Sequence, residues 1–216
     1  MNAHAAGLTC ESITSFPSSV SGERISRDKS DLPDEELLRL CAQEENTAFE
    51  ELTRRYQPAL TRFMARLLYS REDIEEALLS VFLRVWQNAA RFQGRASVKT
   101  WVYRIAINIV YDIQKKNKTR AHQTWSEQAE QSAACGDAEA EALRRLEQDA
   151  QSQALERALL CLPAPDRLLL TLYYYEQMDY EQMQAVTELS YTVLKTRLTR
   201  ARQRLRQIVE AQEAGQ

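Results

Sequence analysis

The sequence predicts an all-α protein made of two small helical domains that a flexible acidic linker joins. Several segments repeat apolar residues at intervals of three and four, the spacing that places side chains on one face of a helix. The chain has only 5 Gly and 5 Pro in 216 residues, and 27% of its residues are charged, which is typical of helical proteins with few tight turns. Between the helical segments lies a polar stretch rich in Glu and Asp.

The composition also excludes several classes of protein. No run approaches the roughly 20 apolar residues that a membrane span needs, and the first residues lack the apolar core and cleavage site of a secretion signal. The 4 Cys residues lie far apart and only 2 His are present, so we expect no disulfide framework, no metal site and no other cofactor. Free thiols in a reducing cytoplasm are expected instead. Cys41 and Cys161 lie within apolar patterns, which favours buried structural thiols.

Residues 1–33 are rich in Ser and Thr, with little apolar content, and are predicted to form a disordered N-terminal tail. The first helical domain is predicted over residues 34–120. After a short amphipathic segment, Thr47-Ala-Phe-Glu50 has the form of a capping box, which predicts the start of a helix. Pro58 lies inside that helical pattern and is expected to kink the helix or divide it.

Two serines predict the starts of the next two helices. Ser70 precedes an apolar pattern that extends to Trp86, and several acids in its first turn match the positive end of a helix. After a polar link, Ser97 precedes a long helix through Ile113. That helix ends in the basic sequence KKNKTR, for which contact with the negative helix end and contact with a polyanion are equally good interpretations.

Residues 121–150 hold seven acids against two arginines and are predicted to be the linker, helical only towards its end. The second domain is predicted over residues 151–212. Its first helix stops at Pro163, and Pro165-Asp166 begins the next, since Pro is tolerated in a first turn. A short amphipathic helix is then built on Met178, Met183 and Val186.

The last predicted helix, Ser190 to Glu210, has two different faces. Its apolar residues recur at steps of four and three, whereas six cations and no acid lie between Ser190 and Arg206. The whole chain carries a net charge of −3, so this basic cluster is local. A solvated face usually mixes both signs, and we therefore favour contact with nucleic acid. A short helix, a tight turn and a longer basic helix together predict a helix-turn-helix.

Six stretches carry a family resemblance. In the first domain they read AFEELTRRYQPAL, REDIEEALLSVFLRVW and FQGRASVKTWVYRIAINIVYDIQKK, and in the second LPAPDRLLLTLYYYE, MDYEQM and TVLKTRLTRARQRL. In this order, and with an acidic linker between the domains, they resemble the extracytoplasmic-function (ECF, group IV) sigma factors of the sigma-70 family. Those proteins are small promoter-recognition subunits of bacterial RNA polymerase. The resemblance covers about residues 34–120 and 151–210.

The resemblance implies that the first domain is sigma region 2, which binds core polymerase and melts the −10 element, and that the second is sigma region 4, which reads the −35 element as duplex. For the −10 loop and helix it implies Arg95, Ser97, Lys99, Trp101, Arg104 and Asn108. We favour a core aromatic role for Trp101 over direct base stacking. On the recognition helix the resemblance implies four residues that face bases: Lys195, Thr196, Thr199 and Arg200. It places Thr192 near DNA as well. Arg197, Arg202 and Arg204 are expected to hold phosphates or acidic neighbours.

The polymerase-binding helix departs from the family pattern. The implied contact residues are Asp73, Glu76, Leu79, Ser80 and Phe82. The family usually has a Gln-acid pair just before its Val-Phe, where this chain has Leu79-Ser80. Around the helix-turn-helix turn, Gln184 and Glu188 stand where the family has a small residue and then Gly, so Glu188 must adopt the backbone geometry that Gly makes easy.

Two functions remain open. The first is an RNA polymerase sigma factor directing promoter recognition and transcription initiation, with core RNA polymerase, promoter DNA and an anti-sigma protein as partners, in the cytoplasm and without membrane insertion. The second is a stand-alone or diverged sigma-like DNA-binding regulator with weakened core binding. Enzymatic activity is not expected, because the sequence has no Gly-rich phosphate loop, no metal cluster and no nucleophile–His pair.

Overall fold

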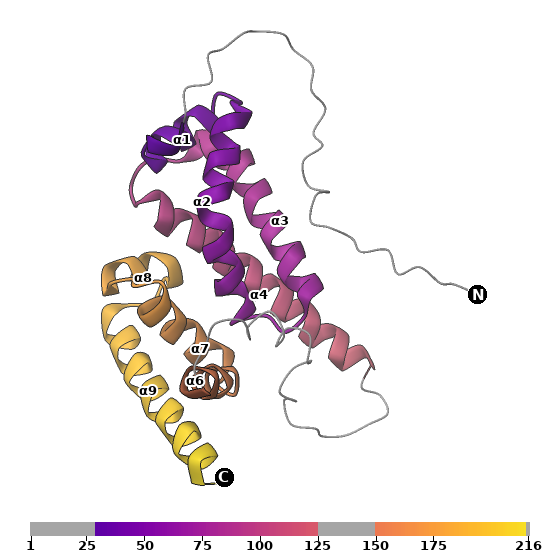
Figure 1. Ribbon diagram of the computed structural model, residues 1–216, viewed down its shortest axis with the longest axis vertical. Coiled ribbons are helices and arrows are strands. Elements are labelled where there is room, and N and C mark those ends of the chain that lie inside the picture. Colours follow the sequence, from indigo (N-terminus) through magenta and orange to yellow (C-terminus); the bar gives the residue numbers. More distant parts are fainter. Residues whose placement is uncertain (1–28, 125–149, 215–216) are drawn as a thin grey trace, which may run out of the picture.

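The computed structural model describes residues 29–124, here called the first module, and residues 150–214, the second module (Figure 1). In these two ranges every regular element is a helix. None of these helices combines the length and apolar character that crossing a membrane requires. The first module contains η1 (Lys29–Asp31), α1 (Asp34–Cys41), α2 (Asn46–Ala65), α3 (Arg71–Asn88), η2 (Ala89–Arg91) and α4 (Val98–Thr124). The second contains α6 (Ala150–Leu160), α7 (Ala164–Leu170), the π-helix η3 (Thr171–Tyr175), α8 (Tyr180–Thr187) and α9 (Tyr191–Ala214).

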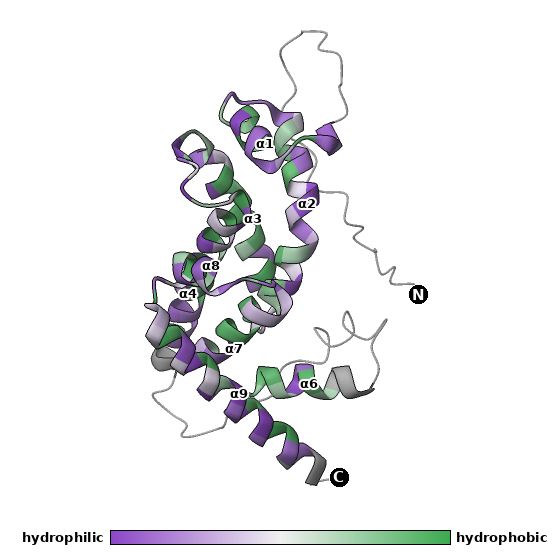
Figure 2. Ribbon diagram, turned by 90° about the vertical axis from the view of Figure 1, so that its left-hand side faces the viewer, coloured by the Kyte–Doolittle hydropathy of each residue, from purple (hydrophilic) through white to green (hydrophobic). Residues whose placement is uncertain are grey.

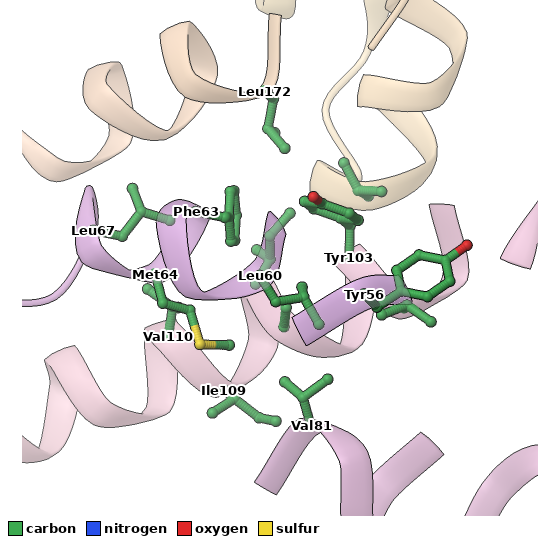
Figure 3. Packing of buried hydrophobic residues seen from close by; sticks show 14 of the residues in the cluster. Tyr56, Leu60, Phe63, Met64, Leu67, Val81, Tyr103, Ile109, Val110 and Leu172 are labelled. Carbon is green, nitrogen blue, oxygen red and sulfur yellow. The ribbon is translucent and has the colours of Figure 1, made fainter. Parts of the chain in front are cut away.

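Helices α2, α3 and α4 form the body of the first module, and α1 packs on α2 at one end. Their apolar faces meet in a common core, where Phe63 of α2 contacts Tyr103 of α4 edge to face, with ring centroids 5.1 Å apart (Figure 3). Met64 of the same helix is fully buried. The three-and-four spacing seen in the sequence thus marks the faces that pack together.

Two of the predicted helix starts are confirmed. The hydroxyl of Ser70 accepts a hydrogen bond from the backbone N–H of Asp73 at 3.0 Å, at the start of α3. Ser97 does the same for Thr100 at 3.1 Å, at the start of α4. Each serine satisfies one of the backbone donors that a helix N-terminus leaves without an internal partner.

The predicted capping box at Thr47 is wrong. Helix α2 begins at Asn46, so Thr47 lies inside its first turn, and Glu45 in the N-cap position makes no side-chain cap. The Thr47 hydroxyl instead accepts a hydrogen bond from Lys29 Nζ at 2.6 Å. Lys29, from upstream in the sequence, therefore binds the hydroxyl that a capping box would direct to a backbone N–H of the helix.

Pro58 does not divide α2, which is continuous from Asn46 to Ala65. The side chain of Pro58 is exposed. On this face water can satisfy the carbonyl group that loses its N–H donor, so the missing hydrogen bond costs less than it would in the core.

The folded part of the first module starts earlier than the sequence predicted. The sequence predicts that residues 29–33 belong to the disordered tail, but Lys29–Asp31 form a 3-10 helix. The guanidinium of Arg55 on α2 donates to the carbonyls of Lys29 at 3.2 Å, Ser30 at 2.5 Å and Leu32 at 2.7 Å. The remainder of the predicted tail, and all but the ends of the predicted linker, lie outside the described residues.

The second module builds its core on α9. Helices α6, α7 and α8 all contact it, and the apolar residues predicted for its inner face are buried or half-buried: Leu194, Leu198, Ala201, Leu205 and Ile208. Helix α8 has a capping box that we did not anticipate, although the sequence Asp179-Tyr-Glu-Gln182 carries its pattern.

The prediction that Cys41 and Cys161 are both buried is half right, because Cys41 is buried whereas Cys161 is exposed.

The two modules pack against each other. Helix α8 contacts α4, and the buried apolar residues of both modules form one continuous cluster. Leu172 of the second module is fully buried and points towards Phe63 and Tyr103 of the first (Figure 3). The sequence predicted two tethered domains, and nothing in its local patterns predicted this packing.

Candidate nucleic-acid interface

The α8–turn–α9 unit has the layout of a helix-turn-helix. Helix α8 ends at Thr187, and α9 begins at Tyr191. Glu188 between them adopts the left-handed conformation with φ 59° and ψ 17°. This turn lets α8 and α9 pack on each other, which directs Leu194 and Leu198 inward. The opposite side of α9 is largely hydrophilic in Figure 2.

The residues predicted to read DNA bases lie on that opposite side. Lys195, Thr196, Thr199 and Arg200 are all exposed, and their spacing of one and four places them on one stripe of the helix. Thr192 and Arg197 are exposed as well. Within the described residues, no salt bridge occupies the three cations Lys195, Arg197 and Arg200. The stripe can therefore meet an anion without first losing an internal partner.

Arg202 and Arg204 differ from these cations because each has a partner within the second module. Arg202 Nε donates to the hydroxyl of Tyr174 at 2.9 Å, and its guanidinium lies 5.0 Å from the ring centre of Tyr173. Arg204 forms an ion pair with Asp166 of α7. Of the two roles predicted for Arg204, a phosphate or an acidic neighbour, the structure provides the acidic neighbour.

A tyrosine cluster, which the sequence analysis missed, includes the two tyrosines that contact Arg202. Tyr173 contacts Tyr174 and Tyr180 with ring centroids 5.0 and 6.0 Å apart, and Tyr180 contacts Tyr191 at 5.3 Å. These rings join η3, α8 and the first residue of α9. Edge and tilted contacts of this kind stabilise aromatic pairs beyond their buried area. The cluster therefore links η3 and α8 to the start of α9, and the Tyr-Tyr-Tyr run is its sequence signal.

The predicted −10 segment leads into α4. Gly94 has φ +65°, a conformation that L residues rarely adopt, and it turns the chain between η2 and α4. Arg95 and Ser97 beside it are exposed, although the Ser97 hydroxyl also caps α4. Trp101 is half-buried and packs on Phe92, with ring centroids 5.4 Å apart, in keeping with the favoured core role.

Farther along α4, the predicted residues meet the second module. Lys99 Nζ donates to the backbone carbonyl of Glu176 at 2.7 Å. Arg104 forms an ion pair with Glu188. Asn108, one turn beyond Arg104, is exposed. Two of the predicted −10 cations are thus paired with groups of the second module.

Tyr103 lies between these two cations in sequence, and its hydroxyl donates to the carboxylate of Glu176. Burial, followed by this hydrogen bond and the negative charge of Glu176, raises the pKa of Tyr103. The phenol therefore stays protonated and remains a donor at neutral pH. Glu176 itself is buried, and the hydrogen bond from Tyr103 offsets part of the cost of removing its carboxylate from water.

The predicted polymerase-contact residues fall into two groups on α3. Asp73 and Glu76 face α4, where Asn117 donates to Asp73 at 2.7 Å and Lys116 lies 3.4 Å from Glu76. Leu79 is 65% exposed, and Leu83, one turn later, is 51% exposed. Ser80 is half-buried and Phe82 is buried. Leu79 and Leu83 therefore form an exposed leucine stripe on α3, whose open surface also carries charged residues such as Glu75 and Arg84. The sequence analysis did not single out Leu83.

Within residues 29–124 and 150–214, no group of three or more His, Cys, Asp and Glu residues has an arrangement suited to a metal ion. The exposed groups of the two modules include cations and threonines on α9 and leucines on α3. Such groups bind polyanions and protein surfaces.

Comparison with known proteins agrees with this arrangement. Residues 52–120 match the family model of Sigma-70 region 2, and residues 152–205 match that of Sigma-70, region 4. The ECF RNA polymerase sigma factor RpoE of Cereibacter sphaeroides is 28% identical over 185 residues, which are 83% of this chain and 97% of that protein. The ECF RNA polymerase sigma factor SigM of Mycobacterium tuberculosis (strain H37Rv) is 28% identical over 179 residues, 82% of this chain and 84% of that one.

Two solved structures share the fold. CnrH, in complex with the cytosolic domain of CnrY, aligns with a TM-score of 0.60 at 20% identity, over 82% of this chain and 97% of that one. The sigma factor RpoE of Bartonella quintana, in complex with the anti-sigma factor NepR, aligns with a TM-score of 0.60 at 23% identity, over 75% of this chain and 96% of that one. The two region matches together span more than half of the chain, in the order of the two modules. The chain therefore belongs to the sigma-70 family, with region 2 in the first module and region 4 in the second.

Proposed function

We propose that the protein is an ECF-type sigma factor, which binds core RNA polymerase and directs it to promoters. Its family is not an enzyme class, and polymerase would carry out the bond chemistry. This function places the protein in the cytoplasm, beside the bacterial DNA. The proposal depends chiefly on α9, which buries Leu194, Leu198 and Ala201 on one face and exposes a cationic stripe on the other.

In this proposal α9 enters the major groove of the −35 element. Arg200 is suited to the O6 and N7 acceptors of guanine, which a guanidinium can bind with two hydrogen bonds. Thr196 and Thr199 donate their hydroxyls to the carbonyls of Thr192 and Lys195 at 2.9 and 3.0 Å. With these hydroxyls bonded to the helix itself, the threonine methyl groups are suited to thymine methyls. Arg197 is placed to hold a phosphate.

The first module is proposed to capture the unpaired −10 strand. An extruded base needs a stacking surface and hydrogen-bond donors. Phe92 provides aromatic surface at the loop and packs on Trp101, which keeps its core role. Arg95 in the loop and Lys99 and Asn108 along α4 provide polar groups. The outer face of α3, with Leu79 exposed, is proposed to bind the polymerase.

A second candidate is a diverged sigma-like regulator that binds DNA but holds core polymerase weakly. The observation in its favour is the exposed Leu79, where the family has a polar residue. An anti-sigma protein is a further proposed partner of either candidate, since the Bartonella quintana neighbour was solved with one.

In vitro transcription tests the proposal directly. Core RNA polymerase is combined with the protein on a library of templates with randomised upstream sequence, and the transcripts are sequenced. We expect start sites that share two upstream elements and that disappear without the protein. The Arg200→Ala variant should lose preference at the upstream element, whereas Glu181→Gln, a change of an exposed residue on α8, should not.

Co-purification with core polymerase separates the two candidates. Retention on the polymerase together with shared upstream elements supports the sigma factor. DNA binding without retention, and without selected start sites, would support the diverged regulator instead.

A further inference from the structure

Arg202 of α9 and Tyr174 of η3 form a hydrogen-bonded pair beside the predicted base-reading stripe. We infer that the guanidinium of Arg202 and the hydroxyl of Tyr174 together bind one phosphate of the DNA backbone at the edge of the −35 major groove. This inference depends on the proposed function, because it assumes that α9 enters that groove with Lys195, Thr199 and Arg200 towards the bases.

The position of Arg202 on α9 suits a contact with the backbone. It follows Lys195 by seven residues, close to two helical turns, so both side chains leave the helix on the same side, at one edge of the stripe. The major groove is about 12 Å wide, little more than the diameter of a helix with its side chains. A side chain at the edge of a groove-facing stripe therefore meets the phosphates of the groove wall before it meets a base.

Arg202 is held by aromatic groups and not by an acid. Its guanidinium lies 5.0 and 5.5 Å from the ring centres of Tyr173 and Tyr174, and no carboxylate pairs with it within residues 29–124 and 150–214. The face of an aromatic ring attracts a cation without neutralising its charge. Arg204, two residues later, is neutralised by Asp166. The charge of Arg202 thus remains available to an anion.

Tyr174 can donate to the same anion. Its side chain is 49% exposed. In the part of the chain that the structure describes, its hydroxyl makes one hydrogen bond, which it accepts from Arg202, so its own proton is left for another acceptor. The proton of Tyr103, by contrast, is already donated to Glu176. A cation that donates to a hydroxyl polarises it and strengthens its own donation, and the resulting bond to a charged phosphate oxygen is of the stronger kind.

The tyrosine cluster fixes this pair relative to the recognition helix. Tyr173 packs on Tyr180, and Tyr180 packs on Tyr191, the first residue of α9. The side-chain amide of Gln177 donates to the carbonyl of Tyr174 at 2.7 Å, which ties down the backbone beside the hydroxyl-bearing ring. Donors that are already ordered lose little conformational freedom on binding. The pair therefore helps to set the register of α9 in the groove.

Tyr69 provides a matched control for Tyr174. Its hydroxyl accepts a hydrogen bond from Arg167 at 2.9 Å, and its side chain is 50% exposed, so the two tyrosines agree in hydrogen bonding and in exposure. Tyr69 lies between α2 and α3 of the first module, away from α9. The variants Tyr174→Phe and Tyr69→Phe each delete one exposed hydroxyl and keep the ring, so we expect both proteins to fold.

The test neutralises single phosphates of the DNA. Core polymerase loaded with the full chain binds a promoter fragment selected from the template library, in which one phosphate at a time around the upstream element is replaced by a neutral methylphosphonate. For the wild type we expect a position where this replacement lowers affinity about five- to tenfold, as for the loss of one or two exposed hydrogen bonds. Tyr174→Phe should bind the unmodified fragment about three- to fivefold more weakly and lose only about a further twofold at that position, since Arg202 alone remains. Tyr69→Phe should behave as the wild type at every phosphate.

Salt dependence separates the two members of the pair. Arg202→Gln removes a charge and should lower the slope of log affinity against log salt concentration by about one unit. Tyr174→Phe removes a neutral donor, so it should weaken binding without changing this slope. A purely structural role of the hydroxyl would produce no difference between one phosphate and the next.

The outcomes distinguish this inference from the proposed function. Sensitivity of Tyr174→Phe to every phosphate replacement as in the wild type would overturn the inference. An equal loss of affinity on all fragments would show that the pair only supports α9 or contacts the polymerase, which would overturn it as well. In both cases the selected promoter would still support the proposed function. If the wild type with core polymerase selects no promoter, the proposed function falls, and this inference falls with it.

Discussion

The guanidinium of Arg204 on α9 binds the carboxylate of Asp166 on α7, and the Asp166 side chain is only 10% exposed. This pair links the DNA-reading helix to the helix behind it. It separates Arg204 from cations of the same basic run, such as Arg200, that have no such partner in the described part of the chain. Arg200 and Arg204 look equivalent in the sequence. Replacing Arg204 should nevertheless change the stability of the protein, whereas replacing Arg200 should change DNA recognition.

Replacing Arg204 with Ala should destabilise the protein, because Asp166 would remain largely buried without its partner. We expect a loss of about 1–3 kcal/mol in the free energy of unfolding, measured by urea denaturation. The exposed Arg200→Ala variant should stay within about 0.5 kcal/mol of the wild type. Equal stability of the two variants would contradict a structural role for the Arg204–Asp166 pair.

Arg200→Ala should instead change DNA recognition. We expect it to cost about 1–3 kcal/mol on the preferred −35 sequence and to reduce discrimination at one or two base pairs. Arg197→Ala should weaken binding to all DNA sequences alike. It should also lower the slope of log affinity against log salt concentration by about one unit, because one fewer counterion is released. Binding of the full chain to a randomised duplex library at two salt concentrations reports both quantities. A uniform loss of affinity for all sequences in both variants would mean that α9 contacts only phosphates and reads no bases.

The exposed leucine stripe on α3 gives a test of polymerase binding. The double change Leu79→Gln/Ser80→Glu restores the polar and acidic pair that the family usually has. We expect it to tighten core binding by about 1–2 kcal/mol, through charge-assisted hydrogen bonds to basic groups of the polymerase. Titration of labelled protein with core polymerase measures the change, with Glu181→Gln as a control far from α3. An unchanged or weaker affinity would show that this interface uses Leu79 itself.

The thiols of Cys41 and Cys161 should react at very different rates. Burial, the largest influence on Cys41, raises the pKa of its thiol to about 11, so almost none of it is thiolate at pH 8. Cys161 is exposed. In a Cys10→Ser/Cys135→Ser background, a disulfide reagent at pH 8 should modify Cys161 rapidly and Cys41 only after urea unfolds the protein. Fast modification of two thiols in the native protein would contradict the buried position of Cys41.

Much of the fold could be predicted because its signals are local. Ser70 and Ser97 cap their helices as predicted, since each hydroxyl needs only a backbone N–H three residues away. The apolar face of α9 is also a local pattern. The capping box of Asp179 and Gln182 at the start of α8 is also a local pattern, and it could have been predicted from the sequence.

The errors arise where a distant group competes with a local one. Thr47 fits a capping box, but Lys29 binds its hydroxyl from eighteen residues away. The contacts of Glu176 and Glu188 with α4 join residues 73 to 84 positions apart. No periodicity or motif encodes such pairs, because they depend on how the two modules meet. The sequence therefore predicted the candidate DNA-binding residues but not which of them are already paired.

The last prediction concerns strand capture by α4. Asn108 is exposed one turn beyond Arg104, and its amide can both donate and accept hydrogen bonds with a base edge. Asn108→Ala should leave the fold and −35 duplex binding unchanged, since the side chain is exposed and α9 is a separate element. It should block open-complex formation, because an unpaired base would lose a hydrogen-bond partner in its captured state.

Permanganate footprinting of unpaired thymines on a selected promoter measures this effect. The matched control is Asp112→Asn, one further turn along the same face, where the amide can still contact Arg84, now 3.6 Å from the Asp112 carboxylate. The control should show normal thymine reactivity, and Asn108→Ala should show strongly reduced reactivity at equal duplex occupancy. Normal reactivity in Asn108→Ala would remove Asn108 from the −10 surface. Loss in both variants would show that the effect is not specific to the Asn108 side chain and would contradict its proposed contact with a base.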